Sequence, residues 1–135
     1  MAGSNRAMRI AGWVVTGLLV LVFAYAGGIK LVPGGPATEG FRRFGYSEEF
    51  RILIGVLEVA GAVGLLIPRL GSWAAAGLAG IMVGAVYTHL STGVPGVRTA
   101  VTTLAMCLFV AYARRASALW LGPASPLPAT QQASR

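Results

Sequence analysis

Four apolar segments, separated by short polar or glycine- and proline-containing connections, dominate the chain. They cover residues 10–32, 52–67, 72–90 and 98–113. A helix needs about 20 apolar residues to cross a bilayer, so the chain has room for four crossings and little else. The pattern predicts one all-α domain over residues 1–115, built as an integral membrane four-helix bundle.

The connection between the first two segments, residues 33–50, alternates aromatic rings with charged side chains. Such a pattern suits the membrane–water boundary, so it predicts a short interfacial helix followed by a turn at Gly45. Two roles remain open for Phe41 and Phe44, which either anchor this helix at the boundary or cover the mouth of a cavity. The proline-containing residues 116–135 are predicted to form a mobile tail.

Two further features concern the ends and faces of the segments. The second segment is short for a full span, so Arg51 and Arg69 at its ends are expected to extend their guanidinium groups toward water. In the third segment, Gly80 and Gly84 lie four residues apart, a spacing that lets two helix backbones approach closely. Packing within the chain is the favoured use of this motif, and a homodimer face is the alternative.

Composition agrees with a membrane protein. Hydrophobic residues make up 56% of the 135 residues and charged residues only 11%, whereas a soluble domain carries about 25% charged residues. The net charge is +7, but no basic run exceeds two residues, which argues against a nucleic-acid interface. One cysteine, Cys107, and one histidine, His89, leave no intrachain disulfide and argue against a metal, haem or iron–sulfur cofactor held by this chain alone.

The basic residues also bear on orientation, because cytoplasmic loops of membrane proteins carry an excess of lysine and arginine. With both termini inside, the basic residues on the cytoplasmic side are Arg6, Arg9, Arg69, Arg114, Arg115 and Arg135. The remaining five lie outside, namely Lys30, Arg42, Arg43, Arg51 and Arg98. The small difference predicts a multi-pass cell-membrane protein with both termini in the cytoplasm.

Glu58 is the one charged residue inside the apolar segment 52–67. An ionised group at the centre of a membrane helix costs a few kcal/mol, and such groups usually face the bundle interior, pair with a basic residue and mark a site. Successive spans run in opposite directions, which places Lys30, His89 and Arg98 in the same leaflet as Glu58. The sequence therefore predicts a pocket that opens to one side, with Glu58 at its floor.

Within this pocket, Glu58 and His89 are the candidate acid–base residues, because both side chains exchange protons. Lys30 and Arg98 are candidate ligand-binding residues that would stabilise negative charge on a ligand. Tyr25 and Tyr87 lie near Lys30 and His89 and complete the predicted ligand-binding set. A plainer alternative remains open, in which the polar groups only hold the helices together or anchor their ends.

Three stretches carry a family resemblance: residues 25–31 (YAGGIKL), 55–69 (GVLEVAGAVGLLIPR) and 82–90 (MVGAVYTHL). In this order and with this spacing, the chain resembles the DoxX-like family of small four-helix bacterial membrane proteins. The resemblance implies a compact four-helix bundle and significance for the positions of Lys30, Glu58 and His89. It also implies work alongside quinone-linked sulfur-compound oxidation or membrane-associated oxidative-stress complexes, but no motif here assigns a reaction.

Three functions follow as hypotheses. The first is a membrane subunit that binds a lipophilic small molecule such as a quinone and receives electrons from a redox partner. The second is a stand-alone enzyme that uses Glu58 as a base on a lipophilic substrate. The third is a non-catalytic scaffold that recruits a protein partner or forms a homo-oligomer. Whether the chain is an enzyme stays open at this point.

Overall fold

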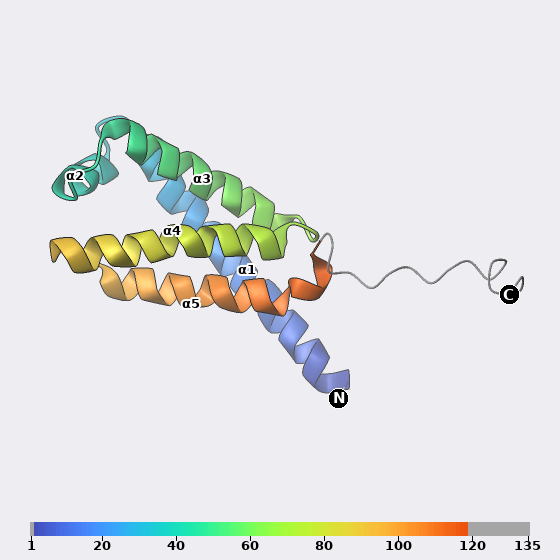
Figure 1. Cartoon of the computed structure of the whole chain (residues 1–135). Helices are drawn as coiled ribbons and strands as arrows, with labels where there is room; N and C mark the ends of the chain where they lie inside the picture. Colours follow the sequence, from blue (N-terminus) through green and yellow to red (C-terminus); the bar gives the residue numbers. More distant parts are fainter. Residues whose placement is uncertain (1, 119–135) are drawn as a thin grey trace, which may run out of the picture.

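A computed structural model of the chain describes residues 2–118, and this part is entirely helical (Figure 1). The elements are α1 (Ala2–Leu31), α2 (Pro36–Arg43), α3 (Glu48–Leu66), α4 (Gly71–Thr92), α5 (Val97–Ala113) and the 3-10 turn η1 (Arg115–Ser117). The predicted all-α class is confirmed. Helices α1, α3, α4 and α5 cover the four apolar segments, and α2 lies where a short helix was predicted. Of the predicted tail, residues 119–135 lie outside the described part of the chain.

Local sequence signals account for where these helices begin and end. Pro36 stands at the first position of α2, where a missing N–H costs nothing. The Ser47 hydroxyl accepts a hydrogen bond of 3.2 Å from the Phe50 backbone N–H and caps α3. Gly45 and Gly93 have φ values of +80° and +69°, a conformation that suits glycine. The predicted turn at Gly45 is therefore confirmed.

The four long helices pack side by side in a ring. Helix α1 contacts α3 and α5, and α4 contacts the same two helices from the opposite side. The core between them consists of apolar side chains that include Leu19, Phe23, Leu65, Leu78 and Val110. At one end of the ring the start of α1 meets the end of α5, whereas α2 lies at the other end (Figure 1).

The backbones of α1 and α3 are in close contact, whereas the sequence predicted such a contact at Gly80 and Gly84 of α4. A Cβ atom added at Gly27 would lie 2.9 Å from the Gly55 carbonyl oxygen, and one added at Gly55 would lie 3.0 Å from the Gly27 carbonyl oxygen. The prediction that Gly80 and Gly84 support helix packing within the chain is wrong. A Cβ added at either position meets no atom of the described residues within 4 Å.

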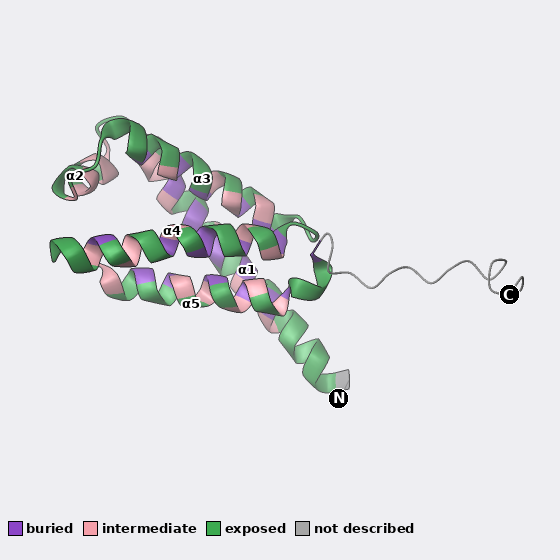
Figure 2. Ribbon diagram, viewed as in Figure 1, coloured by how far each residue is buried: buried purple, intermediate pink, exposed green. Residues whose placement is uncertain are grey.

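Two of the helices are long and apolar enough to cross a membrane: Gly3–Leu31 within α1, and α4. Helix α5 is also apolar but shorter. Helix α3 has 19 residues, and its sequence includes Glu48, Glu49, Arg51 and Glu58. Apolar side chains cover much of the outer surface of the ring, where Figure 2 shows long exposed stretches on every long helix.

Two arginines are buried at helix ends, which sequence reasoning did not anticipate. Arg51 is 1% exposed, and its guanidinium group donates to the carbonyl oxygens of Lys30 and Val32 at the end of α1 and to the Glu48 carboxylate. The expectation that Arg51 extends toward water is therefore wrong. The last carbonyl groups of a helix have no hydrogen-bond donor within that helix. Arg51 of α3 therefore supplies the donors for the carbonyl groups at the end of α1.

Arg114 does the same for the end of α3. It is 6% exposed, and its guanidinium nitrogens lie 2.6 Å from the Leu65 carbonyl oxygen and 3.4 Å from that of Ile67. Its guanidinium carbon also lies 4.3 Å from the centre of the Trp13 ring. The guanidinium group fills the space beside Gly71, where any Cβ atom would collide with it. Arg114 thus joins the ends of α3 and α5 to Trp13 in the first half of α1 and to the start of α4.

Replacing Arg114 by alanine is expected to lower the free energy of unfolding by about 2–4 kcal/mol, because it leaves buried carbonyl oxygens without donors. Thermal unfolding of the detergent-purified protein measures the effect. The neighbouring Arg115→Ala variant is the matched control, because Arg115 is exposed and its guanidinium group contacts Tyr112 at the end of α5. It should cost less than about 1 kcal/mol. Equal losses in the two variants would contradict the role given to Arg114.

Candidate functional site

A cavity of about 770 Å³ lies at the α2 end of the ring, and all five α-helices contribute to its lining. Cavities of about 300–1,000 Å³ are the size that holds small-molecule ligands. Most of the lining is apolar, and from α1 and α3 it includes Val22, Phe23, Ala26, Phe50 and Ile54. The polar lining groups are few, which makes each of them informative about what the cavity holds.

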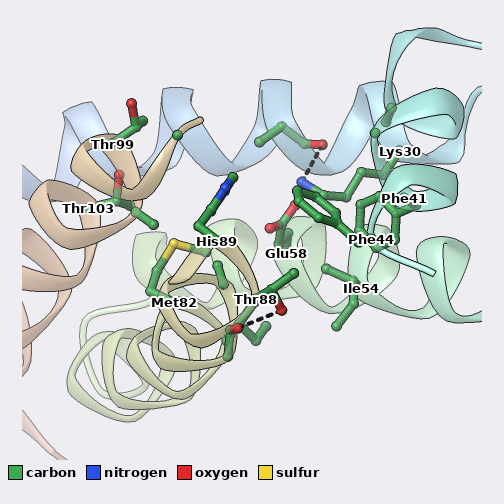
Figure 3. Close-up of a pocket in the computed structure, with 18 of the residues that line it drawn as sticks. Lys30, Phe41, Phe44, Ile54, Glu58, Met82, Thr88, His89, Thr99 and Thr103 are labelled. Atoms are coloured by element: carbon green, nitrogen blue, oxygen red, sulfur yellow. Dashed lines mark hydrogen bonds and ion pairs between the residues drawn. The ribbon is translucent and has the colours of Figure 1, made fainter. Parts of the chain in front are cut away.

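The strongest polar feature of the cavity is a buried ion pair between α1 and α3. Lys30 Nζ lies 2.7 Å from Glu58 Oε2, and the side chains are 16% and 3% exposed. The same ammonium group donates to the Ala26 carbonyl oxygen at 3.2 Å, so its position is held from two sides (Figure 3). Glu58 is the deepest cavity residue on α3. A carboxylate removed from water needs such a partner to remain ionised.

Only one oxygen of Glu58 is engaged in this pair. Oε2 faces Lys30, whereas Oε1 accepts no hydrogen bond from any residue in the described range. Figure 3 shows the carboxyl group reaching the cavity beside the Lys30 ammonium group. Because an ionised carboxylate has acceptor capacity on both oxygens, Glu58 presents an unused acceptor to the cavity.

His89 lines the opposite wall, on α4 (Figure 3). Its Nδ1 lies 2.9 Å from the Val94 carbonyl oxygen. A carbonyl oxygen can only accept, so in the neutral ring the proton sits on Nδ1 and Nε2 has a free lone pair. The ring lies against Gly96, whose φ of +133° and missing side chain leave the space for it. His89 is therefore held in one orientation and one tautomer.

Four aromatic rings form a cluster at the α2 end of the cavity. This aromatic cluster comprises Phe41, Phe44, Tyr46 and Phe50, with neighbouring ring centroids 4.7–6.4 Å apart. Phe44 also meets the His89 ring edge-on at 5.2 Å. All four line the cavity. Phe41 and Phe44 thus cover the α2 end of the cavity, which is compatible with a place at the membrane boundary.

One hydrogen bond fastens the aromatic cluster to α4. The Tyr46 and Thr88 hydroxyl oxygens lie 2.7 Å apart, and the Thr88 hydroxyl is also 2.9 Å from the Gly84 carbonyl oxygen. Because the Thr88 proton is used on that carbonyl, Tyr46 is the donor to Thr88. The connection between α2 and α3 is thereby tied to the far wall of the cavity. Neither Tyr46 nor Thr88 was among the residues predicted for the site.

The structure brings Lys30, Glu58 and His89 to one cavity, but it does not bring the other three predicted residues there. Arg98 is exposed and lies outside the lining. Tyr25 and Tyr87 are 72% and 71% exposed and also lie outside it. Tyr25 therefore does not face the cavity, because its position on α1 turns it outward.

Within residues 2–118, no group of three or more histidine, cysteine, aspartate or glutamate side chains could hold a metal ion. Cys107 is fully buried in the core and does not line the cavity. Thr88, Thr99 and Thr103 add hydroxyl groups to the cavity wall from α4 and α5. The cavity can therefore offer proton-accepting groups, one ammonium group and hydroxyls to a ligand.

Comparison with known families gives one match. Residues 14–112 match the family model described as the DoxX-like family. The matched range contains all of α2, α3 and α4, most of α1 and α5, and every residue that lines the cavity. No curated protein and no solved structure matches the chain.

The ion pair predicts a specific pattern of stability. Lys30→Met should lower the free energy of unfolding by about 3–5 kcal/mol, because it leaves the Glu58 carboxylate buried without its cation. The double variant Lys30→Met, Glu58→Leu should recover most of this loss, since an apolar pair of similar volume fills the same space. Thermal unfolding of the two variants and the wild type measures both effects. A Lys30→Met protein as stable as the wild type would show that the pair does not hold α1 against α3.

Proposed function

The chain belongs to the DoxX-like family, and we propose that it is an integral membrane protein whose four long helices cross the bilayer as a four-helix bundle. The low charge content and the apolar outer surface support this, since lipid must replace water around such a surface. The buried arginines support it as well, because helix ends at a membrane boundary need partners for their carbonyl groups. The aromatic and charged residues of α2 would then lie at the interface.

The proposed orientation places both termini in the cytoplasm. The start of α1 and the end of α5 lie at the same end of the ring, as an even number of crossings requires (Figure 1). The basic residues of the described range divide evenly, five at that end and five at the α2 end, so the cytoplasmic assignment rests on the count over the full sequence. The cavity and α2 would then lie in the outer half of the bilayer.

The proposed function is to bind a lipophilic small molecule of the quinone class in the cavity. The observation that carries this proposal is the Lys30–Glu58 pair, which leaves Glu58 Oε1 unused in an otherwise apolar cavity of about 770 Å³. A purely structural pair would need no cavity beside it. Ligand sites commonly combine an apolar lining with a few convergent polar groups.

The chemistry of the cavity fits a quinone head group. Glu58 Oε1 and His89 Nε2 are acceptors without partners in the described residues, so they suit the two hydroxyl groups of the reduced form. Lys30 has a third N–H beyond its two bonds, which suits a carbonyl oxygen of the oxidised form. Bound quinone would supply two-electron chemistry. Glu58 and His89 would accept or return protons at the named atoms.

Electron supply is assigned to a partner. The chain has a single cysteine, which is buried, so an internal dithiol cannot serve as the donor. We therefore propose a membrane or peripheral redox protein as the partner, and this chain as the subunit that holds the quinone. In this arrangement the chain itself contributes binding and proton transfer rather than a complete reaction.

A scaffold function without a ligand is the second candidate, and one observation favours it. The Lys30–Glu58 pair lies beside the Gly27–Gly55 contact, where α1 and α3 approach most closely. In this position the ion pair would serve equally well to hold the two helices together or to bind a ligand. The two functions differ in whether the cavity binds anything once the protein is folded.

Binding of an alkylated 1,4-dihydroxybenzene to the purified protein tests the proposal. Glu58→Gln removes the charged acceptor but keeps the shape, so affinity should fall about tenfold or more. Glu39→Gln removes the same charge from an exposed position on α2 and should leave affinity unchanged. Titration calorimetry in detergent gives both values, and thermal unfolding confirms that each variant is folded.

A folded Glu58→Gln protein with wild-type affinity would overturn the proposed role of Glu58. Should that variant fail to fold, His89→Gln provides the second test, with an expected loss of severalfold in affinity. A wild-type protein that binds neither the dihydroxybenzene nor the corresponding quinone would favour the scaffold function.

A further inference from the structure

One face of α4 carries three glycines that serve no packing role in the described part of the chain. Gly77, Gly80 and Gly84, here called the glycine face, recur at intervals of three and four residues and therefore share one side of the helix. All three are exposed, and a Cβ atom added at any of them meets nothing within 4 Å. All three nevertheless line the cavity.

The glycine face lies where α3 and α4 move apart. Near their connection the two helices are in tight contact, since a Cβ added at Gly61 would lie 2.6 Å from Leu78 and one added at Gly64 would lie 3.0 Å from Ala74. Toward α2 the two helices diverge (Figure 1). The cavity fills this widening space, and exposed cavity-lining glycines at its border mean that the cavity opens sideways between α3 and α4.

The inner end of this opening holds a polar group, the Glu58 carboxylate. Glu58 is 2% exposed, and its Oε1 faces the cavity without a hydrogen-bond donor from the described residues. This oxygen is not fully buried, because it is reached from the cavity. An ionised carboxylate oxygen without a donor can accept a hydrogen bond from a ligand group in the cavity. The opening therefore connects an apolar exterior with an acceptor inside.

We propose that the glycine face is a side entrance of the cavity, along which the hydrocarbon tail of an amphiphilic ligand extends into the lipid while its hydrogen-bond-donating head group reaches Glu58. This proposal rests on the proposed membrane-bound ligand site and adds its route and the form of its ligand. Glycine suits a tail because the absence of side chains leaves a smooth groove. From residue 77 to residue 89 the lined stretch of α4 is about 18 Å long at 1.5 Å per residue.

A second copy of the chain is the competing occupant of the glycine face. Such faces can bring two membrane helices together. However, Tyr87 projects from the same side of α4 as Gly80 and is 71% exposed, so its ring stands in the way of a close helix contact. A flexible hydrocarbon tail can pass beside this ring, which favours a ligand.

The test compares two ligands and two matched variants in lipid nanodiscs. The ligands are a 1,4-dihydroxybenzene with a decyl chain and the same head group without a chain. Gly80→Phe places a ring in the entrance, whereas Val83→Phe places the same ring at an exposed position of α4 that does not line the cavity. Affinity is measured by competition with a fluorescent analogue, and oligomeric state by light scattering.

Gly80→Phe should weaken binding of the decyl compound at least tenfold and change binding of the chain-free compound less than twofold. Val83→Phe should leave both affinities unchanged. Gly84→Leu repeats the test if Gly80→Phe does not fold. The proposal is overturned if the folded variant binds both compounds as the wild type does, or loses both equally. It is also overturned if the wild type is a dimer that Gly80→Phe dissociates. If the wild type binds neither compound, the proposed ligand site itself fails.

Discussion

Charges and helix-end carbonyl groups that are removed from water must find partners within this chain, and much of the structure follows from that constraint. Arg51 supplies the partner for the end of α1, and Arg114 for the end of α3. Lys30 and Glu58 neutralise each other between the same two helices. In each case a side chain of one helix provides the hydrogen-bond or ion-pair partner of a group on another helix. These contacts fix the register of the helices, which apolar packing alone would leave free to change.

The helices pack closely at one end of the ring and less closely at the other, and this difference creates the cavity. Around the Arg114 end the helices contact each other closely, with Gly61 and Gly64 of α3 against α4. At the α2 end, α3 packs against α1 through Gly55 and the Lys30–Glu58 ion pair, so that α3 lies farther from α4 there. The aromatic cluster closes the end of the widened space, and the Tyr46–Thr88 hydrogen bond fastens it. The cavity and its aromatic cover thus arise because α3 contacts α1 at one end and α4 at the other.

The position of Glu58 gives it two roles that are physically compatible. Through Oε2 it holds α1 against α3, and through Oε1 it offers an acceptor to the cavity. A ligand that donates to Oε1 would complete the partners of a group already held in place, so little ordering of the protein is needed on binding. The fixed tautomer of His89 adds a second positioned acceptor. A chain with 11% charged residues thus gives its cavity two positioned acceptors with few polar side chains.

The sequence by itself determined the helical class, the number and order of the helices, the turn at Gly45 and the end of the ring at which Lys30, Glu58 and His89 lie, whereas α1 and α3 begin several residues before the predicted starts. Hydrophobic length and proline or glycine stops carry that information along the chain. Rotation about each helix axis was decided only by the tertiary structure, because helices that are apolar on every side give no reliable facing signal. Tyr25, Tyr87 and Arg98 share the depth of the site but face away from it, whereas Arg51 turns inward. Likewise, only packing showed that Gly27 and Gly55 form the close helix contact and that Gly80 and Gly84 border an opening.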